Sequence, residues 1–410
     1  MKRQSLWPFR SPWWVVLGAS LGLTVGSLTI LQFAFSMLIK PISAEFGWGR
    51  STVSMAISVA TILSAVGTPF VGRLVDRWGV KPVTLVSIAV FSMATSLMSC
   101  TPASAAAFIV LSAGLGLAGA GQGPLAYAKA ISGAFDKRRG LALGSGMVGV
   151  GVGAAILPRF AQELLESFGW RGAFMGLGLL IFVVAFPAVA LLLREPTART
   201  LTPTAAQATD PGLTAGEVLR TRSFWMLVAV FVFVPMACNG TIVHLHALFT
   251  DRGLPAAVAA QVFSSIGASV IAGRLLCGAL LDRYFAPHVA MLFVALPAIG
   301  ILLLALGVGS SAQSAGAGLV GAGLGAEIDL IAYLQSRYFG MRAFGQVYGY
   351  LFMAFAVGAG LGPLAMGLAF DYAGSYQPVL IGFFTLLALA IYLLSRLPGR
   401  YPYPVRAEPV

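Results

Sequence analysis

The stretch Gly72-Arg-Leu-Val-Asp76-Arg77 returns in the second half of the chain as Gly278-Ala-Leu-Leu-Asp282-Arg283. The two copies lie about 205 residues apart, which is half of the 410-residue chain. In each copy a glycine, which lets helix ends approach closely, precedes an aspartate that can cap a helix or pair with a neighbouring cation. The repeat therefore predicts two related halves that carry the same short loop.

The composition is that of a membrane protein. Hydrophobic residues make up 58% of the chain and charged residues only 10%, whereas a soluble domain carries about a quarter charged residues. The net charge of +12 could suggest a nucleic-acid partner, but the basic residues lie in short loops between apolar runs and form no stripe or tail. We therefore expect the lipid bilayer, and no nucleic acid, as a partner.

Apolar runs long enough to cross a bilayer follow one another along the chain, since a crossing helix takes about 20 residues. We predict twelve of them, at 13–37, 52–72, 82–101, 104–130, 139–160, 172–193, 223–248, 256–280, 288–308, 312–336, 344–369 and 376–396. The predicted fold is all-α, with twelve transmembrane helices in two pseudo-symmetric six-helix bundles. We expect an N-terminal bundle, a cytoplasmic linker, a C-terminal bundle and a cytoplasmic tail at 1–193, 194–222, 223–396 and 397–410.

The distribution of lysine and arginine predicts the orientation. The loops that share a side with both chain ends carry most of the basic residues, as in Lys137-Arg138-Arg139, while the opposite side carries few, among them Lys40 and Arg50. Cytoplasmic loops are enriched in Lys and Arg. We expect both termini in the cytoplasm and the protein in the cell inner membrane.

The loop Gly72-Arg-Leu-Val-Asp76-Arg77-Trp-Gly79-Val-Lys81 resembles the loop 2–3 motif of the major facilitator superfamily. Three further segments resemble the monocarboxylate-porter group of that superfamily and its bacterial relatives, including oxalate/formate exchangers. They are Phe135-Asp-Lys-Arg-Arg-Gly140, Gly169-Trp170-Arg171, and 327–340. The resemblance implies a transporter whose two halves rock about a central site.

The chain departs from that group in its charges. The resemblance predicts a buried lysine in the first span and an aspartate four residues before the arginine of the eighth, but 30–39 holds no cation and the second position is Val270. The lysine that oxalate exchangers carry in the eleventh span is missing from 350–363. The proton relay of the animal carriers cannot be transferred, and one remaining cation favours a substrate with one carboxylate.

That cation is Arg274, in the eighth span. Ionisable groups at membrane depth mark substrate or proton routes, and a guanidinium can bind a carboxylate through two parallel hydrogen bonds. Arg274 is either the substrate anchor or half of a structural ion pair with Glu327 or Asp329. In the empty protein we expect Glu327 to be its counter-ion, so that a proton on Glu327 would free Arg274 for substrate.

Other candidate residues fall into three groups. The predicted substrate-binding residues are Arg274, Tyr127, Asn239, Gln122 and Tyr348. The predicted proton-coupling residues are Glu327, Asp329 and His244. The predicted gating residues are Asp76, Arg77, Asp282, Arg283 and Arg337. For most of them a plain structural role stays open, such as a hydrogen bond between helices or an ion pair.

The sequence predicts a secondary transporter of a small organic anion, taking up a monocarboxylate together with H⁺ by alternating access. The alternatives are efflux of drugs or lipophilic solutes by proton antiport and, in another class, a non-transporting membrane sensor. We expect no enzyme, cofactor or metal, because the Gly-rich run 144–151 lies within a span and lacks the strand–helix setting of a dinucleotide site. We expect a monomer.

Overall fold

A computed structural model describes residues 11–135, 139–193, 212–281, 283–307, 309–340 and 342–401. These residues form helices and short connections, and the one β contact among them is an isolated bridge between Gly212 and Gly340. The predicted linker and tail fall largely on 194–211 and 402–410, which lie outside the described residues. Their boundaries therefore stay predictions.

The helices follow the predicted spans closely. The first half holds α1 (Trp13–Thr24), α2 (Ser27–Thr29), η1 (Ile30–Ala34), η2 (Phe35–Leu38), α3 (Ile39–Phe46), α4 (Arg50–Trp78), α5 (Val80–Leu97), η3 (Met98–Cys100), α6 (Ala105–Gly119), η4 (Ala120–Gln122), α7 (Pro124–Ala134) and α8 (Arg139–Leu192). The second half holds α9 (Ala215–Val218), α10 (Arg222–Asp251), α11 (Ala256–Leu281), α12 (Ala286–Leu306), α13 (Ser310–Phe339), α14 (Phe344–Ala373) and α15 (Gln377–Ser395).

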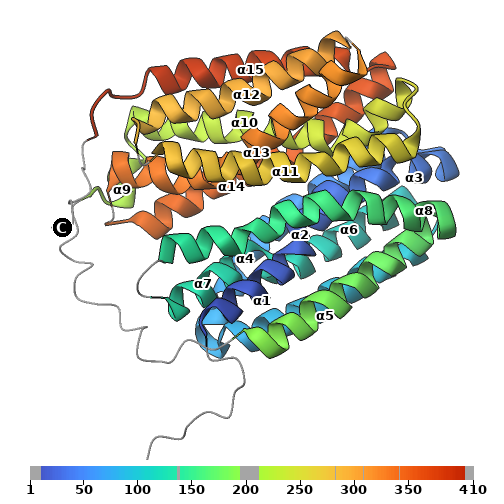
Figure 1. The fold of residues 1–410 in the computed structure, drawn as a ribbon, viewed down its shortest axis with the longest axis horizontal. Coiled ribbons are helices and arrows are strands. Elements are labelled where there is room, and N and C mark those ends of the chain that lie inside the picture. Colours follow the sequence, from blue (N-terminus) through green and yellow to red (C-terminus); the bar gives the residue numbers. More distant parts are fainter. Residues whose placement is uncertain are drawn as a thin grey trace, which may run out of the picture.

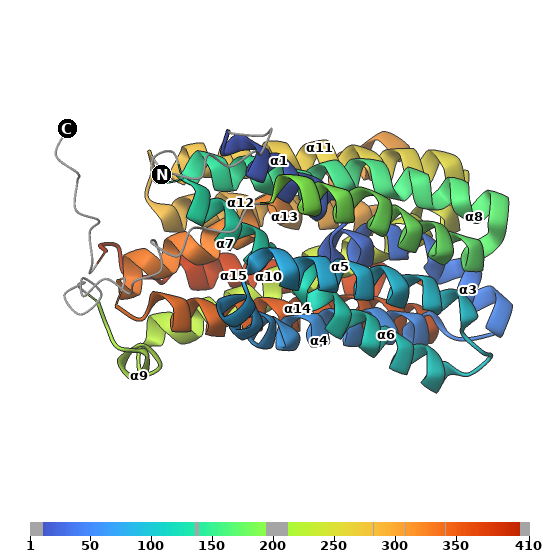
Figure 2. The ribbon, with the colours of Figure 1, turned by 90° about the horizontal axis from the view of Figure 1, so that it is seen from below.

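Eleven helical stretches among the described residues are long and apolar enough to cross a membrane. One of them, α8, has 54 residues and contains Gly169 in a non-helical conformation, with φ 67° and ψ 179°. A straight helix of that length would measure about 80 Å, far more than the roughly 30 Å of a bilayer core. Figures 1 and 2 show α8 folding back on itself, so it crosses twice. The prediction of twelve transmembrane helices is confirmed.

The chain forms two bundles that lie side by side, with α1–α8 below and α10–α15 above in Figure 1. Across the boundary α4 packs against α14, and α8 packs against α11. The start of α1 and the end of α15 lie at the same end of the molecule, which we call the terminal end. The opposite end, where α3 meets α4 and α10 meets α11, is the distal end.

Large apolar side chains cover the outside of both bundles. Val86, Met93, Val110, Leu179 and Leu275 each expose more than half of their surface. Water would disfavour such a surface, whereas lipid solvates it. This burial pattern is the one expected of a multi-pass membrane protein.

Two of the spans are interrupted near mid-depth, which the sequence analysis did not anticipate. The first span breaks at Gly26 and continues as a π-helical and a 3₁₀ turn. The hydroxyl of Thr29 donates to the carbonyl of Leu23 at 2.8 Å and so satisfies a group that the break sets free. The fourth span breaks before Gly123, and Gly26 packs against the carbonyl of Gln122. The two breaks therefore meet beside the boundary between the halves.

Helices in the first half touch backbone to backbone through glycine. A Cβ atom at Gly116 of α6 would lie 2.6 Å from the Cα of Ala60 in α4. No side chain fits at that distance, and small residues at helix contacts are typical of membrane bundles.

We expect Gly116→Ala to lower the thermal unfolding temperature in detergent, because α4 and α6 must separate to admit the methyl group. Overpacking of this kind costs about 1–3 kcal/mol. The matched control is Gly114→Ala in the same helix, where a Cβ would meet no described atom within 4 Å. The control should be neutral or slightly stabilising, since Ala is the better helix former. Equal unfolding temperatures for the two variants would contradict the close contact.

Candidate functional site

A cavity lies between the halves. The first half lines it with small polar side chains, notably Thr61, Ser64 and Thr68 of α4. The second half lines it with apolar side chains, notably Phe352 and Phe355 of α14. These residues lie from the middle of the two helices toward the terminal end. The cavity therefore occupies the middle and the terminal half of the molecule.

A side-chain hydrogen bond joins the two halves beside this cavity. Gln32, which lines the cavity from the π-helical turn of the first span, donates through its Nε2 to the Oδ1 of Asn239 in α10. The Nδ2 of Asn239 donates in turn to the carbonyl of Pro235 at 3.0 Å. Asn239 is buried, so this predicted substrate-binding residue contacts the opposite half and reaches the cavity only through Gln32.

Arg274 lies where α11 and α13 approach most closely. Gly273 touches the backbone of Ala322, and Gly325 touches the backbone of Val270, with no room for a side chain at either glycine. The Nε atom of Arg274 donates to the carbonyl of Gly325 at 3.2 Å. The same atom lies 3.5 Å from a carboxylate oxygen of Asp329. The ion pair between Arg274 and Asp329, which the sequence left open as one role of Arg274, is therefore present in this structure.

Tyr348 completes this group and connects it to the cavity. It lies within electrostatic range of both Arg274 and Asp329. Its ring stacks on that of Phe352, with centroids 5.9 Å apart and an angle of 12° between the planes. Because Phe352 lines the cavity, Tyr348 links the Arg274–Asp329–Tyr348 cluster to the cavity wall, and none of these three residues lines the cavity itself.

Glu327 faces away from this cluster. Its side chain is buried among apolar residues of α10, α12 and α13, such as Phe231 and Phe293, and lies close to the Cys238 thiol. Neither carboxylate oxygen makes a hydrogen bond of ordinary geometry within the described part of the chain. The prediction that Glu327 is the counter-ion of Arg274 is wrong for this structure. Residues two apart on a helix point about 200° away from each other, so only Asp329 can face α11.

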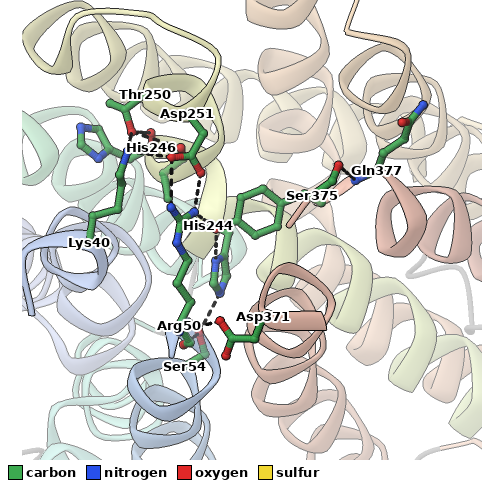
Figure 3. A network of polar contacts seen from close by, with 12 residues as sticks. Lys40, Arg50, Ser54, His244, His246, Thr250, Asp251, Asp371, Ser375 and Gln377 are labelled. Atoms are coloured by element: carbon green, nitrogen blue, oxygen red, sulfur yellow. Dashed lines mark hydrogen bonds and ion pairs between the residues drawn. The ribbon is translucent and has the colours of Figure 1, made fainter. Parts of the chain in front are cut away.

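Ion pairs close the boundary between the halves at the distal end (Figure 3). The guanidinium of Arg50 binds both carboxylate oxygens of Asp251, at 2.5 and 3.0 Å, and Lys40 binds the same carboxylate at 2.7 Å. Asp371 accepts hydrogen bonds from the backbone N–H groups of Arg50 and Ser51, each at 2.9 Å. These two N–H groups begin α4, so a carboxylate of the second half caps a helix of the first.

His244 belongs to the same distal network. Its Nε2 lies 3.0 Å from the carbonyl of Pro363 and 2.8 Å from the Oγ of Ser54, while its Nδ1 lies 3.1 Å from the hydroxyl of Tyr376. A carbonyl can only accept, so we assign the hydrogen to Nε2 and let Nδ1 accept from Tyr376. Burial raises the pKa of the Tyr376 hydroxyl, which keeps it a donor. His244 thus joins the halves through Ser54.

The predicted gating residues lie at the terminal end. Arg77 and Arg283 are exposed there. Arg337 is hydrogen-bonded to Tyr333 at 2.9 Å and lies over the ring of Tyr401, so these contacts stay within the second half. Asp282 and the side chain of Asp76 lie outside what the structure describes. Among the described residues, all the ion pairs between the halves are at the distal end.

Tyr127 and Gln122 lie inside the first half. Both are fully buried, and the Tyr127 hydroxyl donates to the Oε1 of Gln122 at 3.1 Å. The Tyr127 ring packs against Gly22 of α1, where a Cβ would collide with it. In this structure the pair holds the first and fourth spans together, and neither residue lines the cavity.

The distal network was not predicted from the sequence. Lys40 and Arg50 indicated only the orientation, and Asp251 and Asp371 had no predicted role. A signal was available, since Lys40 and Arg50 follow the first span, while Asp251 follows the seventh span and Asp371 the eleventh. Complementary charges in equivalent loops of two halves favour contact between them.

The fold and the cavity define a class of protein. Two bundles of six membrane helices, with a cavity between them that is sealed at one end by contacts across the boundary, form the architecture of an alternating-access transporter. Residues 20–363 match the family model of the Major Facilitator Superfamily. The chain belongs to this superfamily.

Curated relatives include monocarboxylate transporters. The chain is 27% identical to mouse monocarboxylate transporter 11, over 95% of this chain and 88% of that protein. It is 31% identical to rat monocarboxylate transporter 3, over 89% of this chain and 75% of that protein. A solved structure of a D-xylose–proton symporter superposes with a TM-score of 0.74 at 14% identity, over 95% and 98% of the two chains. The predicted resemblance to the monocarboxylate-porter group is confirmed. These relatives are transporters, which agrees with the prediction that the protein is not an enzyme.

We expect Asp251→Asn to open the distal end, because it leaves Arg50 and Lys40 without their shared carboxylate. Charge-assisted hydrogen bonds contribute about 1.5–3 kcal/mol each, so the population open at the distal end should rise by at least tenfold. The measurement is the distance between spin labels at the exposed positions Ala103 and Tyr372, in a Cys100→Ser background.

The control for this experiment is Glu163→Gln. It removes an ion pair of similar length, 3.1 Å to Arg159, that lies within a single helix. The control should leave the label distances unchanged. A distance distribution that Asp251→Asn also leaves unchanged would mean that this network does not hold the distal end closed.

Proposed function

We propose that the protein is a secondary active transporter that moves a small organic anion, a monocarboxylate, together with a proton by alternating access. The observation that carries the proposal is the position of Arg274 with its partner Asp329, which Tyr348 links to the wall of the cavity between the halves. An arginine at membrane depth needs a compensating partner, and a carboxylate can neutralise its charge. That carboxylate can come from Asp329 or from a substrate.

Membrane orientation follows from the basic loops. The terminal end carries most of the lysines and arginines, so we place it in the cytoplasm of a cell inner membrane. The structure is then a state that is closed to the outside by the Arg50–Asp251 network. The cavity lies in the cytoplasmic half, where a substrate would leave. Residues 1–193 and 223–396 are the two bodies that we expect to rock against each other.

Asp329 supplies a coupling scheme that the sequence alone assigned to Glu327. When Asp329 is ionised, its carboxylate pairs with the Nε atom of Arg274. When Asp329 binds a proton the attraction is lost, and the terminal nitrogens of Arg274 can bind a substrate carboxylate in parallel. Where the monocarboxylate-porter resemblance expects an aspartate in the eighth span, this chain has Val270, and Asp329 approaches Arg274 from α13 instead.

The scheme is balanced in charge. A monocarboxylate and one proton enter together without net charge, so the negative interior does not oppose uptake. Relatives named monocarboxylate transporters support the substrate class, while the choice of H⁺ rests on the Arg274–Asp329 pair.

We expect Arg274→Ala to abolish uptake of monocarboxylates into proteoliposomes, because the substrate carboxylate would lose the cation of the Arg274–Asp329–Tyr348 cluster. Arg274→Lys keeps the charge but loses the paired geometry, so it should raise KM by about tenfold or more and leave measurable uptake. Uptake of labelled pyruvate and benzoate measures both effects. The matched control is Arg159→Ala, which removes an exposed arginine from α8.

Near-normal affinity in Arg274→Ala would show that the arginine is structural. Absence of flux for every acid with the wild-type protein would defeat the proposed function as a whole. Export of lipophilic cations against a proton gradient would favour the efflux alternative. A protein that binds acids without any flux would favour a sensor.

We expect Asp329→Asn to separate transport from the proton. The amide cannot carry a proton on and off, so Arg274 should stay available to the carboxylate at every pH. Wild-type uptake should rise as the outside is acidified, whereas uptake by Asp329→Asn should depend little on the pH gradient and persist as exchange. Glu327→Gln is the companion variant, and it should keep the pH dependence. The reverse result would assign coupling to Glu327.

A further inference from the structure

The cavity wall of the second half is a series of parallel aromatic rings. Tyr348 stacks on Phe352 at 5.9 Å and 12°, and Phe352 stacks on Phe355 at 5.6 Å and 18°. Phe352 and Phe355 line the cavity, while Tyr348 continues the stack to Arg274 and Asp329. The stack therefore leads from the middle of the cavity to the anion anchor.

The facing wall is made of small residues. Thr61, Ser64, Ala65 and Thr68 occupy positions i, i+3, i+4 and i+7, which places them on one face of α4. The hydroxyls of Thr61 and Thr68 donate to carbonyls of their own helix, each at 2.9 Å. The methyl groups of these threonines and the remaining lone pairs of their hydroxyl oxygens stay available for contact with a ligand. Because the side chains of this wall are small, they leave open the space that faces the aromatic rings.

The two walls together form a slot that has an aromatic side and a small-residue side, and Arg274 lies beyond Tyr348 at the end of the aromatic stack. Aromatic rings prefer offset stacking or edge contact with other rings, so contact with Phe352 and Phe355, which line the cavity, favours a ring over an alkyl chain.

We propose that the substrate is an aromatic monocarboxylate, whose ring lies between Phe352 or Phe355 and the small-residue face of α4 while its carboxylate reaches toward Arg274. This inference rests on the proposed function, because it assigns the substrate of the same cavity. It makes Phe352 and Phe355 the residues that determine specificity for the body of the substrate.

The test compares acids that share a single carboxylate and differ in the rest of the molecule. Benzoate and cyclohexanecarboxylate have similar size, but only benzoate has a π system, and pyruvate is a small acid without a ring. With wild-type protein in proteoliposomes, we expect benzoate to have the lowest KM of the three. Unlabelled benzoate should inhibit pyruvate uptake at several-fold lower concentration than cyclohexanecarboxylate does.

Phe352→Leu tests the wall itself. It should raise the KM for benzoate by about three- to tenfold, as expected for the loss of one aromatic contact, and change the KM for cyclohexanecarboxylate and the turnover number little. Phe355→Leu is the second variant at the same wall. The matched control is Phe182→Leu, a substitution at a partly exposed phenylalanine that stacks on Phe186 within α8, outside the cavity.

Each outcome separates the two proposals. Equal inhibition by benzoate and cyclohexanecarboxylate, a measurement on the wild-type protein alone, would overturn the aromatic assignment while leaving monocarboxylate transport intact. Unchanged benzoate KM in both wall variants would do the same. Flux of benzamide, which is neutral, that does not depend on Arg274 would show that the slot binds rings without a carboxylate. If the wild-type protein moves none of the acids, the proposed function fails and this inference fails with it.

Discussion

The contact between Arg50 and Asp251 is the interaction on which the observed arrangement of the two halves depends. Among the described residues, no β structure joins the two halves, and they meet along packed helices. Their relative position is therefore set by the side chains that contact one another across the boundary. At the distal end the crossing groups are ionic and partly shielded from water, with side-chain exposures of 12% for Arg50 and 24% for Asp251. Shielding strengthens such pairs relative to a fully solvated surface pair. The cavity exists in its present form because this end is closed.

Close helix packing provides the second condition. Glycine at contacts such as Gly273–Ala322 and Gly325–Val270 brings α11 and α13 together until their backbones touch. That approach aims Arg274 at a carbonyl and a carboxylate of the neighbouring helix. A membrane interior offers no water to compensate a misplaced charge, so the glycines that set the helix distance are as necessary to the site as the arginine is.

Asp329 and Glu327 illustrate how helix geometry separates two roles. Both carboxylates lie on α13, two residues apart, yet one faces Arg274 and the other is enclosed by apolar side chains of its own bundle. The proposed coupling scheme needs a carboxylate whose proton changes the charge next to the substrate anchor. Of the two carboxylates, only Asp329 meets this condition in the observed arrangement, while Glu327 is enclosed by apolar side chains.

The amino-acid sequence determined the architecture. Apolar runs of bilayer length, the repeated loop at Asp76 and Asp282 and the position of the basic residues were enough to predict twelve spans in two halves, because a bilayer admits few folds. It also named Arg274, since a cation in an apolar run stands out. Only the tertiary structure decided that Asp329 is the partner of Arg274, that Tyr127 holds helices together, and that Lys40, Arg50 and Asp251 close one end. Those outcomes depend on the rotation and distance of helices far apart in the chain, which local periodicity does not encode.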